Sequence, residues 1–198
     1  MPDAAPAARP PDPADDRSVA LLPANLYALA FVVPAAVAAV ATWIALWGAE
    51  ALGDGLDAWF DRPLTLLAAV VLGTLAHELL HAGAWRAAGA PAGTVRLGFS
   101  WRALTPFAHC DVPMPARAYR IGAWAPGVVL GAVPLAAALA LGAPRLFWFA
   151  LLFTIAAGGD VLTMWLLRGV GPDRLVADHP SRAGCVVLDR GTAAEAAA

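Results

Sequence analysis

The residues best suited to chemistry in this sequence form one short motif, His77-Glu78-Leu79-Leu80-His81, inside an otherwise apolar run. Side chains four residues apart lie on one face of a helix, so both imidazoles can bind the same metal ion while Glu78 lies beside them and holds a water molecule. This spacing predicts a zinc site at which a Zn-activated water attacks a peptide bond and Glu78 is the general base.

A zinc ion that activates water needs a third protein ligand and one open position. Asp160 is the only other acid inside an apolar stretch long enough to span a membrane. The motif lies about 13 to 17 residues from the start of its apolar stretch, and Asp160 lies about 14 residues from the start of a later stretch that crosses in the same direction. At a helical rise of ~1.5 Å per residue, both positions are roughly 20–25 Å along their helices, so they lie at the same depth. Gly158 and Gly159 are small enough to let two helices approach closely. We therefore expect His77, His81 and Asp160 to bind Zn²⁺.

Other roles for the same residues must be weighed. The two histidines could hydrogen-bond between helices, with the acids as structural partners. A charged group at mid-span costs about 2.5–3.5 kcal/mol on insertion scales, so ionisable residues in spans usually mark functional sites. Two non-enzymatic functions stay open: a membrane protein with a structural or regulatory metal site, and a small transporter whose ion path these residues line. The absence of an evident repeat counts against the transporter.

Two further polar clusters point less clearly to a metal. Adjacent side chains in a strand point to opposite faces, so His109, Cys110 and Asp111 cannot all bind one ion, and a surface-loop role is expected for them. The run Asp178-His179-Pro180 is typical of a turn or a helix cap.

Four apolar stretches must position these residues. The chain is 60% hydrophobic with a mean hydropathy of +0.66, well above the roughly 45–50% apolar content of soluble domains. Each stretch is long enough to cross a hydrocarbon core of ~30 Å. They cover residues 26–47, which Pro34 interrupts, and residues 64–88, 121–141 and 146–167. We predict an all-α membrane protein with four transmembrane helices.

The connections between the stretches differ in charge and pattern. The other loops hold only Arg62 and Arg145, whereas both tails and the middle loop are richer in arginine, so both termini and residues 89–119 are expected in the cytoplasm. Residues 94–101 alternate like a strand, which predicts a short β-hairpin-like loop between helices two and three. Residues 50–63 are polar and rich in turn formers, and predict a loop with Trp59 and Phe60 at the membrane interface.

Composition also sets the expected domains and partners. We expect a disordered cytoplasmic tail over residues 1–22, a four-helix transmembrane domain over 23–170 and a cytoplasmic tail over 171–198. No basic run favours nucleic acid, so the expected partners are the lipid bilayer and a peptide or membrane-protein substrate. Cys110 and Cys185 form no CxxC pair and are expected to be reduced thiols.

Several of these segments together resemble a known family. They are the motif His77 to His81, the loop His109-Cys110-Asp111-Val112-Pro113, the run Tyr119-Arg120-Ile121-Gly122-Ala123, the triplet Gly158-Gly159-Asp160 and the tail segment from Asp178 to Cys185. Over most of the chain after Leu64, the sequence resembles a bacterial membrane family described as putative zincin peptidases. The resemblance implies a zinc-dependent endopeptidase in the bacterial cytoplasmic membrane.

A looser resemblance is to site-2-type intramembrane proteases. These proteins place a His-Glu-x-x-His motif on one membrane helix and an aspartate ligand on a later one. Their Asn-Pro-x-x-Asp-Gly signature is absent, because Gly158 and Gly159 precede Asp160 and Val161 follows it. The resemblance therefore does not extend to their role in regulated proteolysis.

Overall fold

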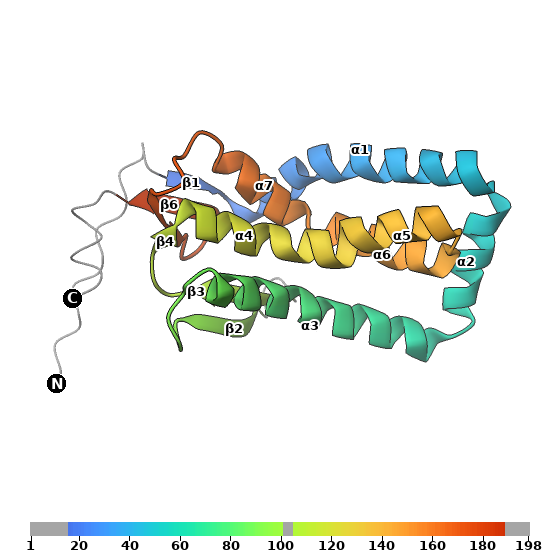
Figure 1. The fold of residues 1–198 in the computed structure, drawn as a ribbon, viewed down its shortest axis with the longest axis horizontal. Coiled ribbons are helices and arrows are strands. Elements are labelled where there is room, and N and C mark those ends of the chain that lie inside the picture. Colours follow the sequence, from blue (N-terminus) through green and yellow to red (C-terminus); the bar gives the residue numbers. More distant parts are fainter. Residues whose placement is uncertain (1–15, 101–104, 189–198) are drawn as a thin grey trace.

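The computed structural model describes residues 16–100 and 105–188, and four helical segments that are long and apolar enough to cross a membrane run side by side through it (Figure 1). This confirms the four predicted helices, although each segment begins earlier than its apolar stretch, the first and third by five residues. The segments are α1 (Leu21–Trp47), α3 (Pro63–Ala87), a third made of α4 (Ala116–Pro126), the π-helix η1 (Gly127–Ala132) and α5 (Val133–Leu141), and a fourth made of α6 (Pro144–Ala156) and α7 (Gly158–Leu166).

The four segments differ in how much of their surface is buried. The most apolar window of the fourth segment is 39% buried, against 11% to 17% for the other three, so α6 and α7 form the centre of the bundle. Large apolar side chains point outward from the surrounding helices, including Leu67, Leu72 and Val133, each at least 60% exposed. A soluble monomer rarely exposes so much contiguous apolar surface. The exposed surface is therefore suited to contact with lipid.

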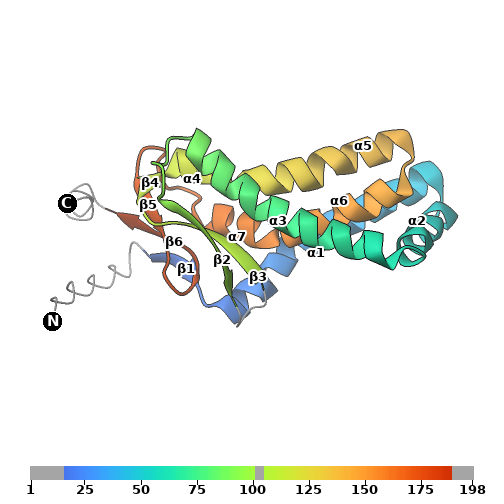
Figure 2. The ribbon, with the colours of Figure 1, turned by 90° about the horizontal axis from the view of Figure 1, so that it is seen from below.

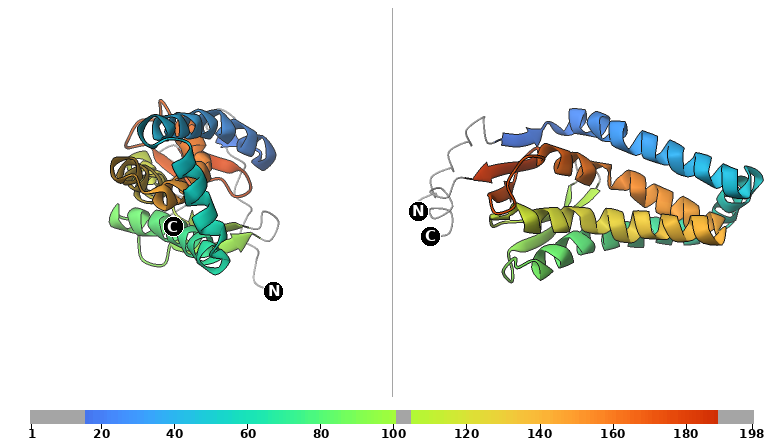
Figure 3. Two further views of the ribbon diagram at one scale, coloured as in Figure 1. Left: turned by 90° about the vertical axis from the view of Figure 1, so that its right-hand side faces the viewer. Right: turned by 45° about the horizontal axis from the view of Figure 1, so that its top comes forward.

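The predicted loop over residues 50–63 is wrong in one respect, because most of it is a helix, α2 (Glu50–Phe60). This helix crosses the end of the bundle between α1 and α3 (Figure 3). The Trp59 indole donates to the Arg145 carbonyl at 3.0 Å, and the Trp148 indole donates to the Leu52 carbonyl at 2.9 Å. These long-range indole hydrogen bonds fix α2 on α6, which the polar composition of the segment did not indicate.

The opposite end of the bundle carries a four-stranded antiparallel sheet (Figure 2), so the expectation of an all-α protein is wrong there. Its order is β1-β6-β5-β4. The strands are β1 (Asp16–Val19), β4 (Met114–Pro115), β5 (Leu175–Asp178) and β6 (Ala183–Leu188). Residues 16–22 of the tail expected to be disordered therefore form β1 and the start of α1, and the C-terminal tail forms β5 and β6 as far as Leu188. Residues 1–15 and 189–198 of these two tails lie outside the described residues.

The sheet is ordered because its side chains enter a core shared with the helices. Trp85 of α3, Tyr119 of α4 and Leu167 meet Val176 and Cys185 of the sheet in one buried cluster. Neither Cys185 nor Cys110 forms a disulfide. Burial, together with the nearby Asp178 carboxylate, raises the pKa of the Cys185 thiol to about 12, so this thiol stays protonated at neutral pH.

A second pair of strands lies within the connection between α3 and α4. β2 (Val95–Ser100) and β3 (Thr105–Cys110) pair antiparallel, with Leu97 opposite Ala108. The strand-like alternation in the sequence runs to Trp101, which lies outside the described residues. The two strands pack along α3, and β3 lies next to the residues of the candidate site (Figures 1 and 2).

Helix α3 approaches α6 closely at a glycine, which gives the first prediction. A Cβ atom on Gly73 would lie 2.2 Å from the Phe153 ring, whereas one on Gly83 of the same helix would meet nothing within 4 Å. We expect Gly73→Ala to destabilise the fold by about 1–3 kcal/mol, the usual range for overpacking. Thermal unfolding in detergent measures this, with Gly83→Ala as the matched control. Equal unfolding midpoints for the two variants would contradict the close contact.

Candidate metal centre

Helix α3 brings the three polar residues of the motif to one level of the bundle. His77 and His81 are 8% and 7% exposed, and their ring centroids are 4.9 Å apart because one helical turn separates them. Glu78 lies beside them, partly buried. Both rings point into the protein, although α3 presents most of its remaining surface outward. The helix therefore places two buried imidazoles and one carboxylate around the same cavity.

Asp160 reaches the two histidines from the fourth segment. This segment is interrupted at Ala157, whose ψ of 4° separates α6 from α7. Asp160 lies in the first turn of α7. One carboxylate oxygen is 3.2 Å from Nε2 of His77 and the other is 3.3 Å from Nε2 of His81. The structure therefore brings together the three residues expected to be ligands, with their ligand atoms within 4.8 Å of one another.

The polar atoms of this group fit a bound cation. Oδ2 of Asp160 and Nδ1 of His77 are buried and form no regular hydrogen bond with the described residues, although Oδ2 lies 3.2 Å from Nε2 of His77. Burying an ionised carboxylate among apolar side chains is costly unless a positive charge or hydrogen bonds compensate it. Two imidazole nitrogens and a carboxylate are also a ligand set found at catalytic zinc sites. A divalent cation between them would supply the missing positive charge.

A backbone carbonyl fixes the orientation of His81. Nδ1 of His81 lies 2.9 Å from the carbonyl oxygen of Gly122, so the tautomer that donates this proton leaves Nε2 free to bind a metal. The Trp85 ring stacks on the other side of His81, with the centroids 5.5 Å apart. A Cβ atom on Gly122 would lie 2.0 Å from the Trp85 indole nitrogen. Only glycine lets α4 come this close, and neither periodicity nor charge in the sequence identified Gly122 as part of the site.

The two glycines before Asp160 have different surroundings. A Cβ atom on Gly158 would lie 2.7 Å from the side chain of Val32 on α1, so the expected close approach of helices is found at this position. A Cβ atom on Gly159 would have no other atom within 4 Å, and this residue instead lines the cavity beside the metal centre. The expectation that Gly159 also permits close packing is wrong, because this residue faces the open side of α7.

A cavity of about 220 Å³ adjoins the histidines, Glu78 and Asp160. Part of its wall is strand β3, through Pro106, Phe107 and Ala108. The backbone N–H of Ala108 donates to the Glu78 carboxylate. The cavity is therefore bounded by helices on one side and by an extended strand on the other, and the strand helps to orient Glu78.

Asp178 at the end of β5 also lines this cavity, and it holds β3 in place. Its carboxylate accepts hydrogen bonds from the Tyr119 hydroxyl at 2.6 Å and from the backbone N–H of Cys110 at 3.0 Å. Nδ1 of His109 lies 3.2 Å from the same carboxylate. Three elements, α4, β3 and β5, thus meet at one side chain.

The two polar clusters that the sequence did not favour as metal sites therefore have structural roles. His109 and Cys110 belong to β3 and not to a surface loop, and Cys110 is only 3% exposed. Asp111 pairs with Arg96 across the two strands. The predicted turn is present, since Nδ1 of His179 accepts from two backbone N–H groups that follow it. The role of Asp178 was missed, because its partners lie 59 and 68 positions away in the sequence.

Comparison with known families agrees with this geometry. The family profile described as "Putative zincin peptidase" matches residues 70–174, which is more than half of the chain and includes every residue of the centre except Asp178. The chain belongs to this zincin peptidase family. No curated protein and no solved structure matches this chain. The family name implies zinc, and the cluster of His77, His81 and Asp160 is the group of described residues that could hold it.

Metal content tests the ligand set directly. We expect purified wild type to hold close to one zinc per chain, and His77→Ala and Asp160→Ala to lose most of it, because each removes one of three ligands. Glu78→Gln should retain zinc, since Glu78 is not expected to bind it. Inductively coupled plasma mass spectrometry measures the content, with Asp173→Ala as an exposed control. Full zinc retention in Asp160→Ala would exclude Asp160 as a ligand.

The contacts of Asp178 give a separate prediction. Asp178→Ala leaves the donors of Tyr119 and Cys110 without an acceptor, which costs about 1–3 kcal/mol for each buried group. We expect backbone amides of residues 105–110 to exchange hydrogen faster, as measured by mass spectrometry. The control is Asp173→Ala, which removes only an exposed pair with Arg117. Unchanged protection in Asp178→Ala would show that β3 does not depend on this side chain.

Proposed function

We propose that this protein is a zinc-dependent endopeptidase embedded in the bacterial cytoplasmic membrane. The observation that carries the proposal is the convergence of His77, His81 and Asp160 beside Glu78 in one cavity. A structural metal site has no need of a second carboxylate, Glu78, held next to the ligands by a backbone hydrogen bond. A catalytic site needs such a group as a base.

The proposed reaction assigns a role to each residue. When bound, zinc lowers the pKa of water toward ~7 and polarises a carbonyl group. His77, His81 and Asp160 hold the ion, and the Gly122 carbonyl keeps His81 in the tautomer that can do so. Glu78 accepts a proton from the attacking water and passes it to the leaving amine. The Ala108 amide keeps the Glu78 carboxylate directed into the cavity while this proton is transferred.

The proposed location follows from the four apolar helices and the distribution of arginine. Both chain ends and β2 and β3 would lie on the cytoplasmic side, with α2 on the other. His77 lies 14 residues after the start of α3 at Pro63, or about 21 Å along the helix at ~1.5 Å per residue. The centre would therefore lie within the membrane but closer to its cytoplasmic face.

The proposed substrate is a peptide segment in extended form, because the peptide bonds of a helix are shielded by their hydrogen bonds. The strand-like pattern of the sequence from Val95 to Trp101 suggests an edge that would hold such a segment by adding it to the sheet. In the structure β3, and not β2, borders the cavity, so any pairing of substrate with a strand is assigned to the region of Pro106 to Ala108.

Activity measurements distinguish this proposal from a structural metal site or a transporter. Wild type reconstituted in liposomes should cleave members of a library of membrane-protein segments, and Glu78→Gln should reduce the rate by at least about 100-fold, the lower end for loss of a general base. Zinc content measured on the same samples provides the control. Cleavage that persists in Glu78→Gln would exclude Glu78 as the base. Metal-dependent ion flux without cleavage would favour the transporter.

A further inference from the structure

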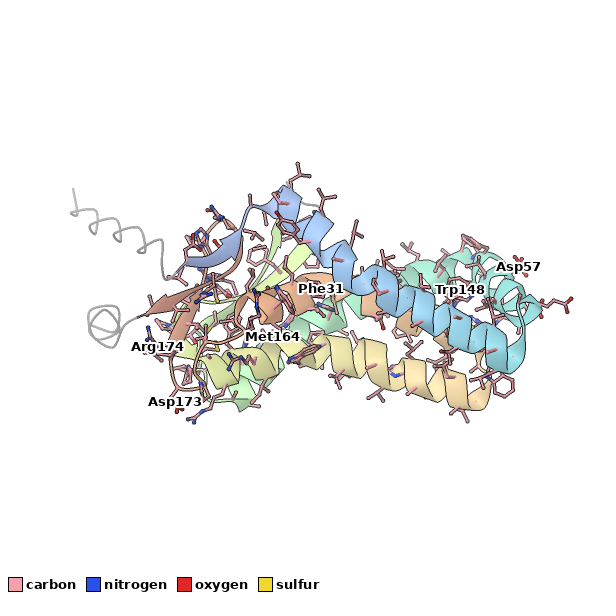
Figure 4. The ribbon with its side chains drawn as sticks, turned by 90° about the horizontal axis from the view of Figure 1, so that it is seen from above. Phe31, Asp57, Trp148, Met164, Asp173 and Arg174 are labelled. Carbon is pink, nitrogen blue, oxygen red and sulfur yellow. The ribbon has the colours of Figure 1, made fainter. Side chains whose placement is uncertain are left out.

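An apolar groove lies at the α2 end of the bundle, away from the metal centre. Its walls come from three helices: Trp59 and Phe60 of α2, Ala69 and Val70 of α3, and Trp148 and Leu152 of α6. Its volume is about 160 Å³, and none of its lining residues also lines the metal cavity. Figure 4 shows Trp148 at the same end as Asp57, opposite Asp173 and Arg174 of the sheet end.

The groove ends where α3 and α6 touch. The lining residues of α3 run from Leu66 to Val70, and the next inward position is Gly73, against which the Phe153 ring is packed. The distance from Leu66 to Gly73 is about 10 Å along the helix. The groove is therefore a short apolar slot, open toward the exterior and closed before it reaches the level of His77.

A positive charge lies beside the mouth of the groove. The Arg145 guanidinium lies 4.8 Å from the centre of the Trp59 ring, which forms one wall. Its Nε is buried without a hydrogen-bond partner, and no carboxylate within 4.0 Å is found for it in residues 16–100 and 105–188. Arg145 also lies in the first turn of α6, where the helix dipole favours an anion. The side chain thus combines an unsatisfied donor with a positive charge that lacks an anion.

We propose that this groove binds a phospholipid, whose phosphodiester accepts hydrogen bonds from Arg145 and whose acyl chain fills the slot. A bilayer offers both groups at the required places, because Arg145 lies at the end of a membrane span and the groove runs from there toward the interior. The lipid would bridge α2, α3 and α6, in addition to the indole hydrogen bonds of Trp59 and Trp148 and the contact of Gly73 with Phe153. The proposal rests on the membrane location proposed above and not on peptidase activity.

The test uses full-length protein purified in detergent and stripped of lipid. Native mass spectrometry and thermal unfolding are measured with a palmitoyl-oleoyl phosphatidylglycerol, with the matching diacylglycerol, and with inorganic phosphate. We expect one retained phospholipid and a higher unfolding midpoint, and neither effect from diacylglycerol or phosphate. Arg145→Gln should weaken apparent affinity about tenfold, the change that loss of one charged hydrogen bond gives.

Matched controls separate the groove from the general surface. Ala69→Leu fills the slot and should abolish retention, whereas Ala68→Leu, at the neighbouring exposed position, should leave it unchanged. Arg62→Gln removes a charge at the same end of the bundle, outside the lining of the groove, and should also have no effect. Equal retention in Ala69→Leu and Ala68→Leu, or equal binding of diacylglycerol and phospholipid, would overturn the proposal. We expect zinc content to stay unchanged in every arm, because no substitution touches the metal ligands, so failure here leaves the proposed peptidase untouched.

Discussion

The placement of the Asp160 carboxylate between two buried imidazoles is the interaction on which this structure depends. Such a group is costly in apolar surroundings unless a cation or several donors compensate it. Oδ2 of Asp160 forms no regular hydrogen bond with the described residues, and Nε2 of His77 lies 3.2 Å from it. The interruption of the fourth segment at Ala157 and the contact of Gly158 with α1 place this carboxylate where His77 and His81 can share a cation with it. A single divalent ion would thus tie the central segment to α3.

Close contacts at small residues position the rest of the centre. Helices in a membrane gain little from burying apolar surface against one another, so the fit of small residues decides which faces meet. Gly122 admits the Trp85 ring and thereby brings its own carbonyl to His81. Gly73 admits Phe153 and closes the space between α3 and α6. The same kind of contact thus orients a ligand at one level and separates the metal cavity from the apolar groove at another.

The two ends of the bundle have different chemical character. At the sheet end, β3 and Asp178 surround the metal cavity with hydrogen-bonding groups, and the sheet joins both terminal segments over the core beneath it (Figure 2). At the other end, α2 crosses the bundle (Figure 3), and aromatic side chains line the apolar groove beside the Arg145 guanidinium. The metal cavity is suited to chemistry with water, and the apolar groove to contact with lipid. The level at which Phe153 meets Gly73 divides them.

The sequence by itself determined the four apolar helices and the group of His77, Glu78, His81 and Asp160. It did so because both signals are local: apolar runs of sufficient length, and ionisable residues that are rare and costly inside such runs. The tertiary structure alone decided that α2 is a helix, that the terminal segments form a sheet, and that Gly122 and Asp178 support the centre. Those features depend on partners distant in the chain, such as Trp59 with Arg145 and Tyr119 with Asp178. The residues of a short polar segment do not indicate which distant residue it will contact, so the conformation of the segment is decided only when the whole chain packs.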